Sequence, residues 1–342
     1  MTHKTLSLTA RAALGTPSAL LVLALAGSPA FAQSSVSLYG LVDVSIGASR
    51  TAGTADSIKN VDSGKMTTSF IGFKGSEDLG GGLSAIFQLD SFLRADGGLN
   101  GRFTGDSFWA RNAWVGLASK EWGSLKLGRN TTPLFVATLS FNPFGDSFGY
   151  SPSIRHVFSS NTVTGDSGWS DSALYTTPLI GGGFVGTAFV AAGEGSGGRN
   201  TGLGGGWSDG GPLAGSLVYQ KVGKNNGTTA VDDTTAWLGS VSYDLSVVKL
   251  FGQYAKVDNT TRNIDYKLYE AGVAVPVGNG KVLAQYGQIS PSAGGKRKTI
   301  TVGYDHSLSK RTDAYVVAMS DKVEGITNGN GYSYSVGIRH RF

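Results

Sequence analysis

The chain has 342 residues, with 52 glycines, nine prolines and no cysteine. The absence of cysteine excludes disulfides, thiolate metal sites and a cysteine nucleophile. The formal net charge is +5, or +3 without Lys4 and Arg11 of the N-terminal segment described next, which gives no strong case for a nucleic-acid partner.

The first 32 residues have the pattern of a secretory signal peptide. Lys4 and Arg11 precede the apolar run "ALLVLALAG" (19–27), and "SPAFA" ends at Ala32. The apolar run is shorter than the roughly 20 residues that a membrane-spanning helix needs. We therefore predict cleavage after Ala32, which leaves an exported mature domain over residues 33–342.

The mature chain alternates between apolar and polar residues with a period of two. This alternation is typical of strands that have one apolar and one polar face. It is clearest in "SVSLYGLVDVSIG" (35–47), "GGLSAIFQLD" (81–90) and "RKTITVGYDHSL" (297–308). No convincing amphipathic helix separates the strands, which excludes parallel β-α-β folds.

Short and long connections follow one another along the chain. The short ones include residues 76–82, 119–123, 208–212, 276–280 and 307–311, and the long polar ones include 49–66, 93–106, 129–170, 221–234, 291–296 and 321–330. Tight turns at one rim and long loops at the other are typical of an up-and-down transmembrane β-barrel. The segments number about 16, an even count that suits a bacterial outer-membrane barrel.

Aromatic residues close the apolar faces of many strands near the turns. They are Trp114, Tyr219, Tyr243, Tyr254, Tyr269, Tyr286, Tyr304 and Phe342. Aromatic girdles at the two lipid interfaces explain this placement. A soluble β-sandwich is the alternative for alternation alone, but its core does not require such girdles.

The last segment, "GYSYSVGIRHRF" (331–342), alternates up to Phe342. In a closed barrel the final strand must pair with the first one, since an unpaired edge in hydrocarbon would leave backbone groups unsatisfied. We therefore expect the last strand to lie against the strand near residue 36.

Several stretches in this order resemble the general porins of beta-proteobacteria, a trimeric, 16-stranded group within the Gram-negative porin family. They are "SSVSLYGLVDVSIG" (34–47), "IGFKGSEDLGGGLSAIFQLD" (71–90), "RNAWVGL" (111–117), "WGSLKLGRN" (122–130), "GYDHSLSKRTDAYV" (303–316) and the Phe-terminal strand. The resemblance covers the whole mature chain. It implies a passive outer-membrane channel for ions and small hydrophilic solutes.

The resemblance also implies a constriction. The loop after the fifth strand, "NTTPLFVATLSFNPFGDSFGYSPSIRHVFSSNTV" (130–163), should fold into the lumen and present Asp146 at its tip. Arg111 and Arg129 match inward wall arginines of the family. On the second strand Phe70 stands where the family commonly has arginine, so one wall charge is missing and any anion selectivity should be weak.

The resemblance further implies a homotrimer in contact with outer-membrane lipid and lipopolysaccharide, with the loop 93–106 reaching over a neighbouring subunit. No cofactor or metal is expected, because the four histidines have no metal-ligand spacing. The chain shows no catalytic constellation. The alternatives to a diffusion channel are a barrel hydrolase and an adhesive barrel whose lumen is filled with side chains. Arg111, Arg129 and Asp146 could also be ordinary solvated wall or turn residues.

Overall fold

A computed structural model describes residues 35–193, 198–223 and 231–342. The chain divides into two units, Met1–Phe31 and Ala32–Phe342, and every described residue belongs to the second. The predicted signal peptide and its cleavage site after Ala32 lie outside the described residues. That part of the sequence analysis stays a prediction.

Eighteen strands and two short helices make up the described part of the chain. The strands are β1 (Ser35–Arg50), β2 (Ile58–Ser63), β3 (Phe70–Gly80), β4 (Leu83–Arg94), β5 (Leu99–Asn100), β6 (Asn112–Ser119), β7 (Gly123–Thr131), β8 (Gly168–Thr176), β9 (Phe184–Ala191), β10 (Asn200–Ser208), β11 (Leu213–Val222), β12 (Thr234–Asp244), β13 (Lys249–Asn259), β14 (Ile264–Val277), β15 (Gly280–Pro291), β16 (Arg297–Ser307), β17 (Thr312–Val323) and β18 (Asn330–Arg341). The helices are α1 (Pro133–Ser140) and α2 (Pro152–Phe158).

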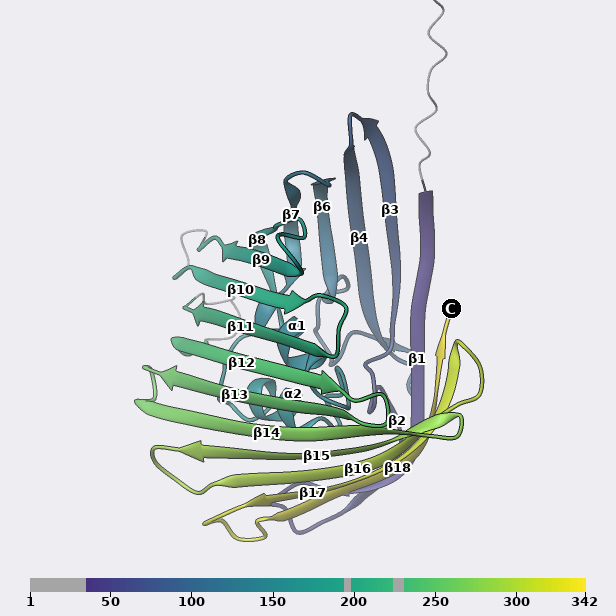
Figure 1. Ribbon diagram of the computed structural model, residues 1–342. Coiled ribbons are helices and arrows are strands. Elements are labelled where there is room, and N and C mark those ends of the chain that lie inside the picture. Colours follow the sequence, from purple (N-terminus) through teal and green to yellow (C-terminus); the bar gives the residue numbers. More distant parts are fainter. Residues whose placement is uncertain (1–34, 194–197, 224–230) are drawn as a thin grey trace, which may run out of the picture. The chain divides into compact units, whose positions relative to one another are not determined.

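Sixteen of these strands form the wall of one antiparallel barrel. Figure 1 shows them side by side around it. The other two are short additions: β2 pairs with β1, and the two-residue strand β5 pairs with β4. The predicted fold class, an up-and-down barrel of about 16 strands, is confirmed.

The barrel closes between its first and last strands. Leu41 lies opposite Arg341, and the register continues to Arg50 opposite Tyr332. The backbone N–H groups of Gly40 and Phe342 each donate to the other residue's carbonyl at 3.2 Å. The prediction that the last strand pairs with the first is therefore confirmed, and these two strands satisfy each other's backbone groups.

The alternation in the sequence corresponds to the two faces of the wall. Outward residues such as Ile300 and Val302 are exposed, whereas the intervening Thr299 and Thr301 are buried. One aromatic residue departs from the predicted girdle. Trp114 lies opposite Gln88, on the same face as the buried Asn112, and the Lys126 ammonium lies 4.5 Å from its ring centroid. The expectation that Trp114 faces outward is wrong, because its strand begins with the inward Asn112 and keeps that parity.

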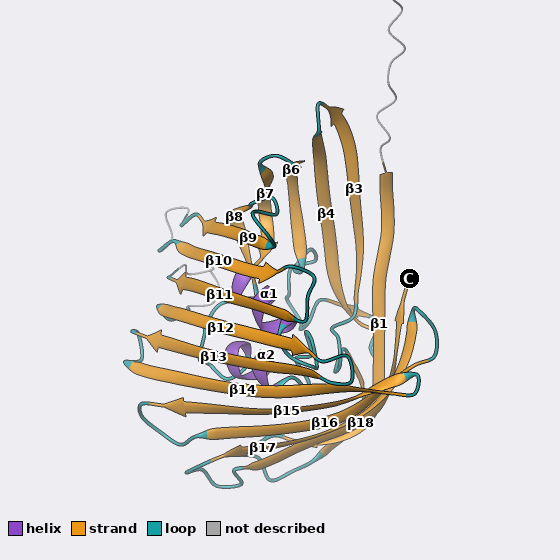
Figure 2. Ribbon diagram, in the orientation of Figure 1, coloured by secondary structure: helices purple, strands orange, loops and turns teal. Residues whose placement is uncertain are grey.

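The long connection between β7 and β8 lies inside the barrel and carries both helices (Figure 2). Each helix begins with a proline preceded by a capping hydroxyl: Thr132 Oγ1 accepts from the Phe135 amide, and Ser151 Oγ accepts from the Ile154 amide. Proline at the first helical position and a Ser or Thr cap satisfy the start of a helix. No helix in the described ranges is long and apolar enough to cross a membrane.

Candidate functional site

The inward loop, residues 132–167, packs on the inner face of the wall through its helices. Leu134, Ala137 and Val157 of the loop belong to one apolar cluster with wall residues that alternate with the outward ones, among them Leu238 and Leu268. Apolar burial of this kind stabilises the docked position. The predicted inward fold of this loop agrees with the structure, and the loop occupies part of the lumen.

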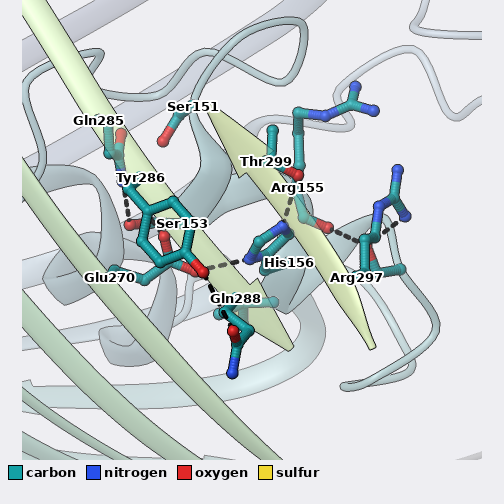
Figure 3. Close-up of polar contacts among 12 residues, drawn as sticks. Ser151, Ser153, Arg155, His156, Glu270, Gln285, Tyr286, Gln288, Arg297 and Thr299 are labelled. Carbon is teal, nitrogen blue, oxygen red and sulfur yellow. Dashed lines mark hydrogen bonds and ion pairs between the residues drawn. The ribbon is translucent and has the colours of Figure 1, made fainter. Parts of the chain in front are cut away.

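A buried polar network fixes α2 to the opposite wall (Figure 3). His156 is fully buried; its Nδ1 lies 2.7 Å from Glu270 Oε1 and its Nε2 lies 2.8 Å from Thr299 Oγ1. The Thr299 hydroxyl donates to Asp321 at 2.8 Å, so it accepts the Nε2 proton of His156. A second proton is therefore shared between Nδ1 and Glu270.

A glycine makes room for this network. A Cβ on Gly287 would lie 2.2 Å from Glu270 Oε2 and 2.7 Å from His156 Cε1. Neither atom can retreat easily, because the His156 and Glu270 side chains are held on both sides. Residue 287 must therefore be glycine for α2 to dock in this position.

The tip of the loop is fixed near the seam between β1 and β18. Tyr150 is fully buried, its hydroxyl donates to Ser335 at 2.6 Å, and its carbonyl accepts from Thr301 at 2.8 Å. The Ser147 hydroxyl donates to the carbonyl of Lys65 at 2.7 Å. The loop is thus anchored to several strands and to the connection between β2 and β3.

Asp146 lies in this part of the loop. Its Oδ1 accepts from the Thr67 hydroxyl at 3.2 Å, and Thr67 in turn accepts from Arg339 at 3.0 Å. Burial raises the pKa of the Asp146 carboxyl above its usual range, and the charge of Arg111, the Thr67 hydrogen bond and the charge of Arg339 offset only part of this effect. Its negative charge is therefore easier to neutralise than that of an ordinary aspartate.

Arg111 and Phe70 lie together on the wall. The guanidinium carbon of Arg111 is 4.0 Å from the Phe70 ring centroid, and Arg111 Nη1 donates to Asp90 at 2.8 Å. Phe70 is 8% exposed, so its ring forms the floor beneath the guanidinium group rather than a free wall of the pore. Asp90 is fully buried and also accepts from Tyr39 and Asn112.

Arg129 has different partners. Its guanidinium group donates to Asp166, to Ser170 and to the carbonyl of Ala110, and Asp166 also accepts from Arg102. A bulge lies between Gly128 and Asn130 in the pairing of β7 with β8. Burial would raise the pKa of Asp166, but Arg102 and Arg129 outweigh it and lower the value to about 2. No hydrogen bond or ion pair among the described residues joins Arg129 to Arg111 or Asp146.

Most ion pairs of the inner wall and the loop share one asymmetry, which is that arginine is the more exposed member. The side chain of Arg111 is 29% exposed and that of its partner Asp90 is 0% exposed; Arg297 is 19% exposed and Asp321 is 4% exposed. The pairs of Arg339 with Asp305 and of Arg129 with Asp166 are exceptions, since in both the aspartate is the more exposed. Because water surrounds the exposed member, these arginines contribute more to the field in the lumen than their carboxylates do.

The sequence analysis missed four buried carboxylates: Asp90 and Asp321 pair with arginines, whereas Asp43 accepts from Tyr315 and Glu270 pairs with His156. Asp43, Asp90, Glu270 and Asp321 all occupy inward, buried positions. Acidic residues at the polar positions of alternating strands indicated inward carboxylates. Their partners could not be identified from the sequence, because those partners come from distant strands. In the described ranges, no group of three or more His, Asp or Glu side chains could hold a metal ion.

Comparisons with known proteins bear on the whole chain. A family model described as Gram-negative porin matches residues 19–325. The chain is 32% identical to outer membrane porin protein 32 of Delftia acidovorans, over 95% of this chain and 98% of that protein. It is 29% identical to an outer-membrane porin of Bordetella pertussis, over 95% of this chain and 98% of that protein.

A solved structure resembles the fold described above. The anion-selective porin from Comamonas acidovorans superposes with a TM-score of 0.77 at 28% sequence identity. The match covers 91% of this chain and 100% of the solved chain. The similarity therefore extends over the barrel as a whole rather than over one motif.

Proposed function

The chain belongs to the Gram-negative porin family and forms a channel for passive diffusion in the outer membrane, and within that function we propose a weak preference for anions set by Arg111 at the constriction. Small hydrophilic solutes and ions cross a water-filled lumen down their gradients. The loop 132–167 narrows that lumen, Arg111 faces its narrow section from the wall with the Phe70 ring beneath it, and Asp146 lies on the loop. A constriction role for Arg129 stays a prediction.

One observation carries the proposal, namely the exposure of Arg111 over a fully buried Asp90. A fixed positive charge that faces water raises the local concentration of anions, and rings of such charges are one means by which channels select ions. The single tip carboxylate, Asp146, opposes it only in part because burial raises its pKa. The balance therefore favours anions weakly. The similar porin from Comamonas acidovorans, named as anion-selective, supports the same direction.

We propose that the protein has no enzymatic activity. The residues that a barrel hydrolase would need are held in structural pairs, since His156 is fully buried between Glu270 and Thr299. His340 bonds Thr312 on the outer face, and His306 lies near Tyr304 at a turn.

The test is the reversal potential of purified protein in a planar bilayer across a KCl gradient. Removing one charge about 6 Å from the ion path in water changes each ion's energy by about 0.7 kcal/mol before screening. Arg111→Gln should therefore shift the chloride-to-potassium permeability ratio toward potassium by about twofold to fivefold. Arg311→Gln, at an exposed turn between β16 and β17, is the matched control. An identical shift in both variants, or none in Arg111→Gln, would refute the assignment.

We also propose a homotrimer, with lipid and lipopolysaccharide around it. The outward side chains near the β1–β18 seam are large and exposed: Val36, Leu38, Ile46, Val336 and Ile338. An apolar face of this kind suits protein contact as well as lipid. Mass measurement after extraction in mild detergent should give three chains, and a monomer that persists under gentle extraction would count against the proposal.

A further inference from the structure

A polar pocket lies between the inward loop and the β1–β18 seam, apart from the residues proposed for the constriction. Its volume is about 290 Å³, and Arg50, Lys65, Arg155, Asp62 and Asp321 are its charged lining residues. Phe148 and Gly149 of the loop cover one side, and Tyr332 and Ser333 of β18 form another. Arg111, Asp146 and Phe70 do not line it.

Arg155 reaches this pocket from α2 with little compensation of its charge. Its contacts are long: Nη1 lies 3.4 Å and 3.5 Å from the carbonyls of Phe148 and Gly149, and Nη2 lies 3.5 Å from Asp321. In Figure 3 its side chain extends away from the His156–Glu270 pair. Burial lowers the pKa of Arg155 from its ordinary value, and the charge of Asp321 offsets this only in part.

Asp321 compensates the charge of Arg155 only in part, because it is already paired with Arg297. Arg297 donates from Nε to Asp321 Oδ1 at 2.8 Å and from Nη2 to Oδ2, a bidentate pair, and Thr299 donates to Oδ1 at 2.8 Å. Two guanidinium groups therefore share one carboxylate. One positive charge is left over on this side of the pocket.

The opposite side of the pocket carries a second spare charge. Arg50 donates to the carbonyl of Asn330 at 2.9 Å and lies 5.3 Å from the Tyr332 ring centroid, and no carboxylate in the described ranges pairs with it. Lys65 is paired with Asp62 at 2.8 Å and contributes no net charge. The buried Nε atoms of Arg50 and Arg155 have no hydrogen-bond partner among the described residues.

We propose that this pocket binds a small oxyanion, a carboxylate or a phosphate, between Arg50 and Arg155. Guanidinium groups present planar pairs of donors that match the oxygen atoms of either anion, and charge-assisted hydrogen bonds of this kind are the strong ones. The volume is at the lower limit of about 300 Å³ for ligand pockets, so the ligand is a small anion.

The inference deepens the proposed function and rests on it, because a soluble anion reaches this pocket through the lumen. It adds a binding site to a channel whose constriction only filters ions. An anion held here would also place negative charge beside the loop and lower the current that the channel carries.

The test is calorimetric titration of the folded, detergent-solubilised protein with succinate and, separately, with inorganic phosphate in a low-salt zwitterionic buffer. Saturable binding of either anion is expected, and which of the two binds distinguishes carboxylate from phosphate. Arg50→Gln and Arg155→Gln should each weaken binding by about tenfold, because each removes a charged donor. Arg155→Lys should bind more tightly than Arg155→Gln, because it keeps the charge.

Arg311→Gln, an exposed turn arginine, is the matched control and should bind like the parent protein. If Arg155→Gln does not fold, Arg50→Gln decides, because Arg50 lies at the end of β1 and outside the loop. Absence of saturable binding to the parent, or equal affinity in the parent and both glutamine variants, overturns the proposal. This readout does not depend on ion selectivity, so the site and the anion preference of the constriction can fail separately.

Discussion

Breaking the His156–Glu270 pair should loosen the inward loop without unfolding the barrel. The change is His156→Leu or Glu270→Met, and each variant removes one partner and leaves the other unpaired. In the parent protein His156 is fully buried and the Glu270 side chain is 4% exposed. The wall itself keeps its strand pairing, because neither side chain takes part in backbone hydrogen bonds. The expected defect is therefore local to α2.

The magnitude follows from the burial of the pair. Removing one partner of a buried, hydrogen-bonded ionisable pair costs about 3 kcal/mol, since the remaining group keeps its desolvation cost and loses its partner. Every 1.4 kcal/mol changes an equilibrium tenfold, so the balance between docked and undocked loop should shift by about 100-fold. The double variant, His156→Leu with Glu270→Met, should cost less than the two single variants together, because no orphan is left.

Hydrogen exchange of the α2 amides measures this balance directly. The amides of Arg155 and Ser159 donate to the carbonyls of Ser151 and Arg155 in the docked helix, and their protection reports local opening. In each single variant, the protection of these amides against exchange should fall by about 100-fold. Single-channel conductance should become noisier in the same variants, because the undocked loop fluctuates in the lumen.

His340→Ala is the matched control, because His340 is exposed on the outer face and bonds Thr312 of the neighbouring strand. It should leave α2 protection unchanged. Additive losses in the double variant, or full protection in both single variants, would show that the pair does not hold the loop and that the apolar cluster around Leu134 is sufficient.

Other expected outcomes concern charge. Phe70→Arg should raise the preference for anions, measured as a shift in reversal potential, because it adds a second guanidinium group beside Arg111. The preference for anions should rise as the pH is lowered toward the ordinary pKa of aspartate, because the raised pKa of Asp146 means that this carboxylate is neutralised before ordinary ones. Asp146→Asn should abolish that pH dependence. Asp166→Asn should lower the melting temperature at neutral pH. The difference in melting temperature between the parent and the variant should be fully present above about pH 3.9, the pKa of an aspartate in the unfolded chain. It should vanish as the pH falls through about 2, the pKa of Asp166 in the folded protein.

The barrel could be predicted from local patterns in the chain. Alternation with a period of two, with an apolar face for lipid and a polar face for water, is a local property of each strand, so it can be recognised without knowing the partner strand. The regular order of short and long connections determined that the strands run up and down. Closure of the first strand on the last followed because an open edge in hydrocarbon is too costly.

The role of each charged residue depends on contacts between distant strands. Asp43 and Tyr315 form a hydrogen bond across 272 residues of sequence, and His156 and Glu270 across 114, distances over which no local pattern acts. The two helices of the inward loop are stable because the inner wall buries their apolar side chains, and short helices gain little stability of their own. Alternation predicts that Phe70 points inward, but its position beneath the Arg111 guanidinium group depends on strand register. Alternation in the sequence indicates most residues that face the lumen, with Trp114 as an exception, whereas pairing across the barrel decides which charges remain exposed to the lumen.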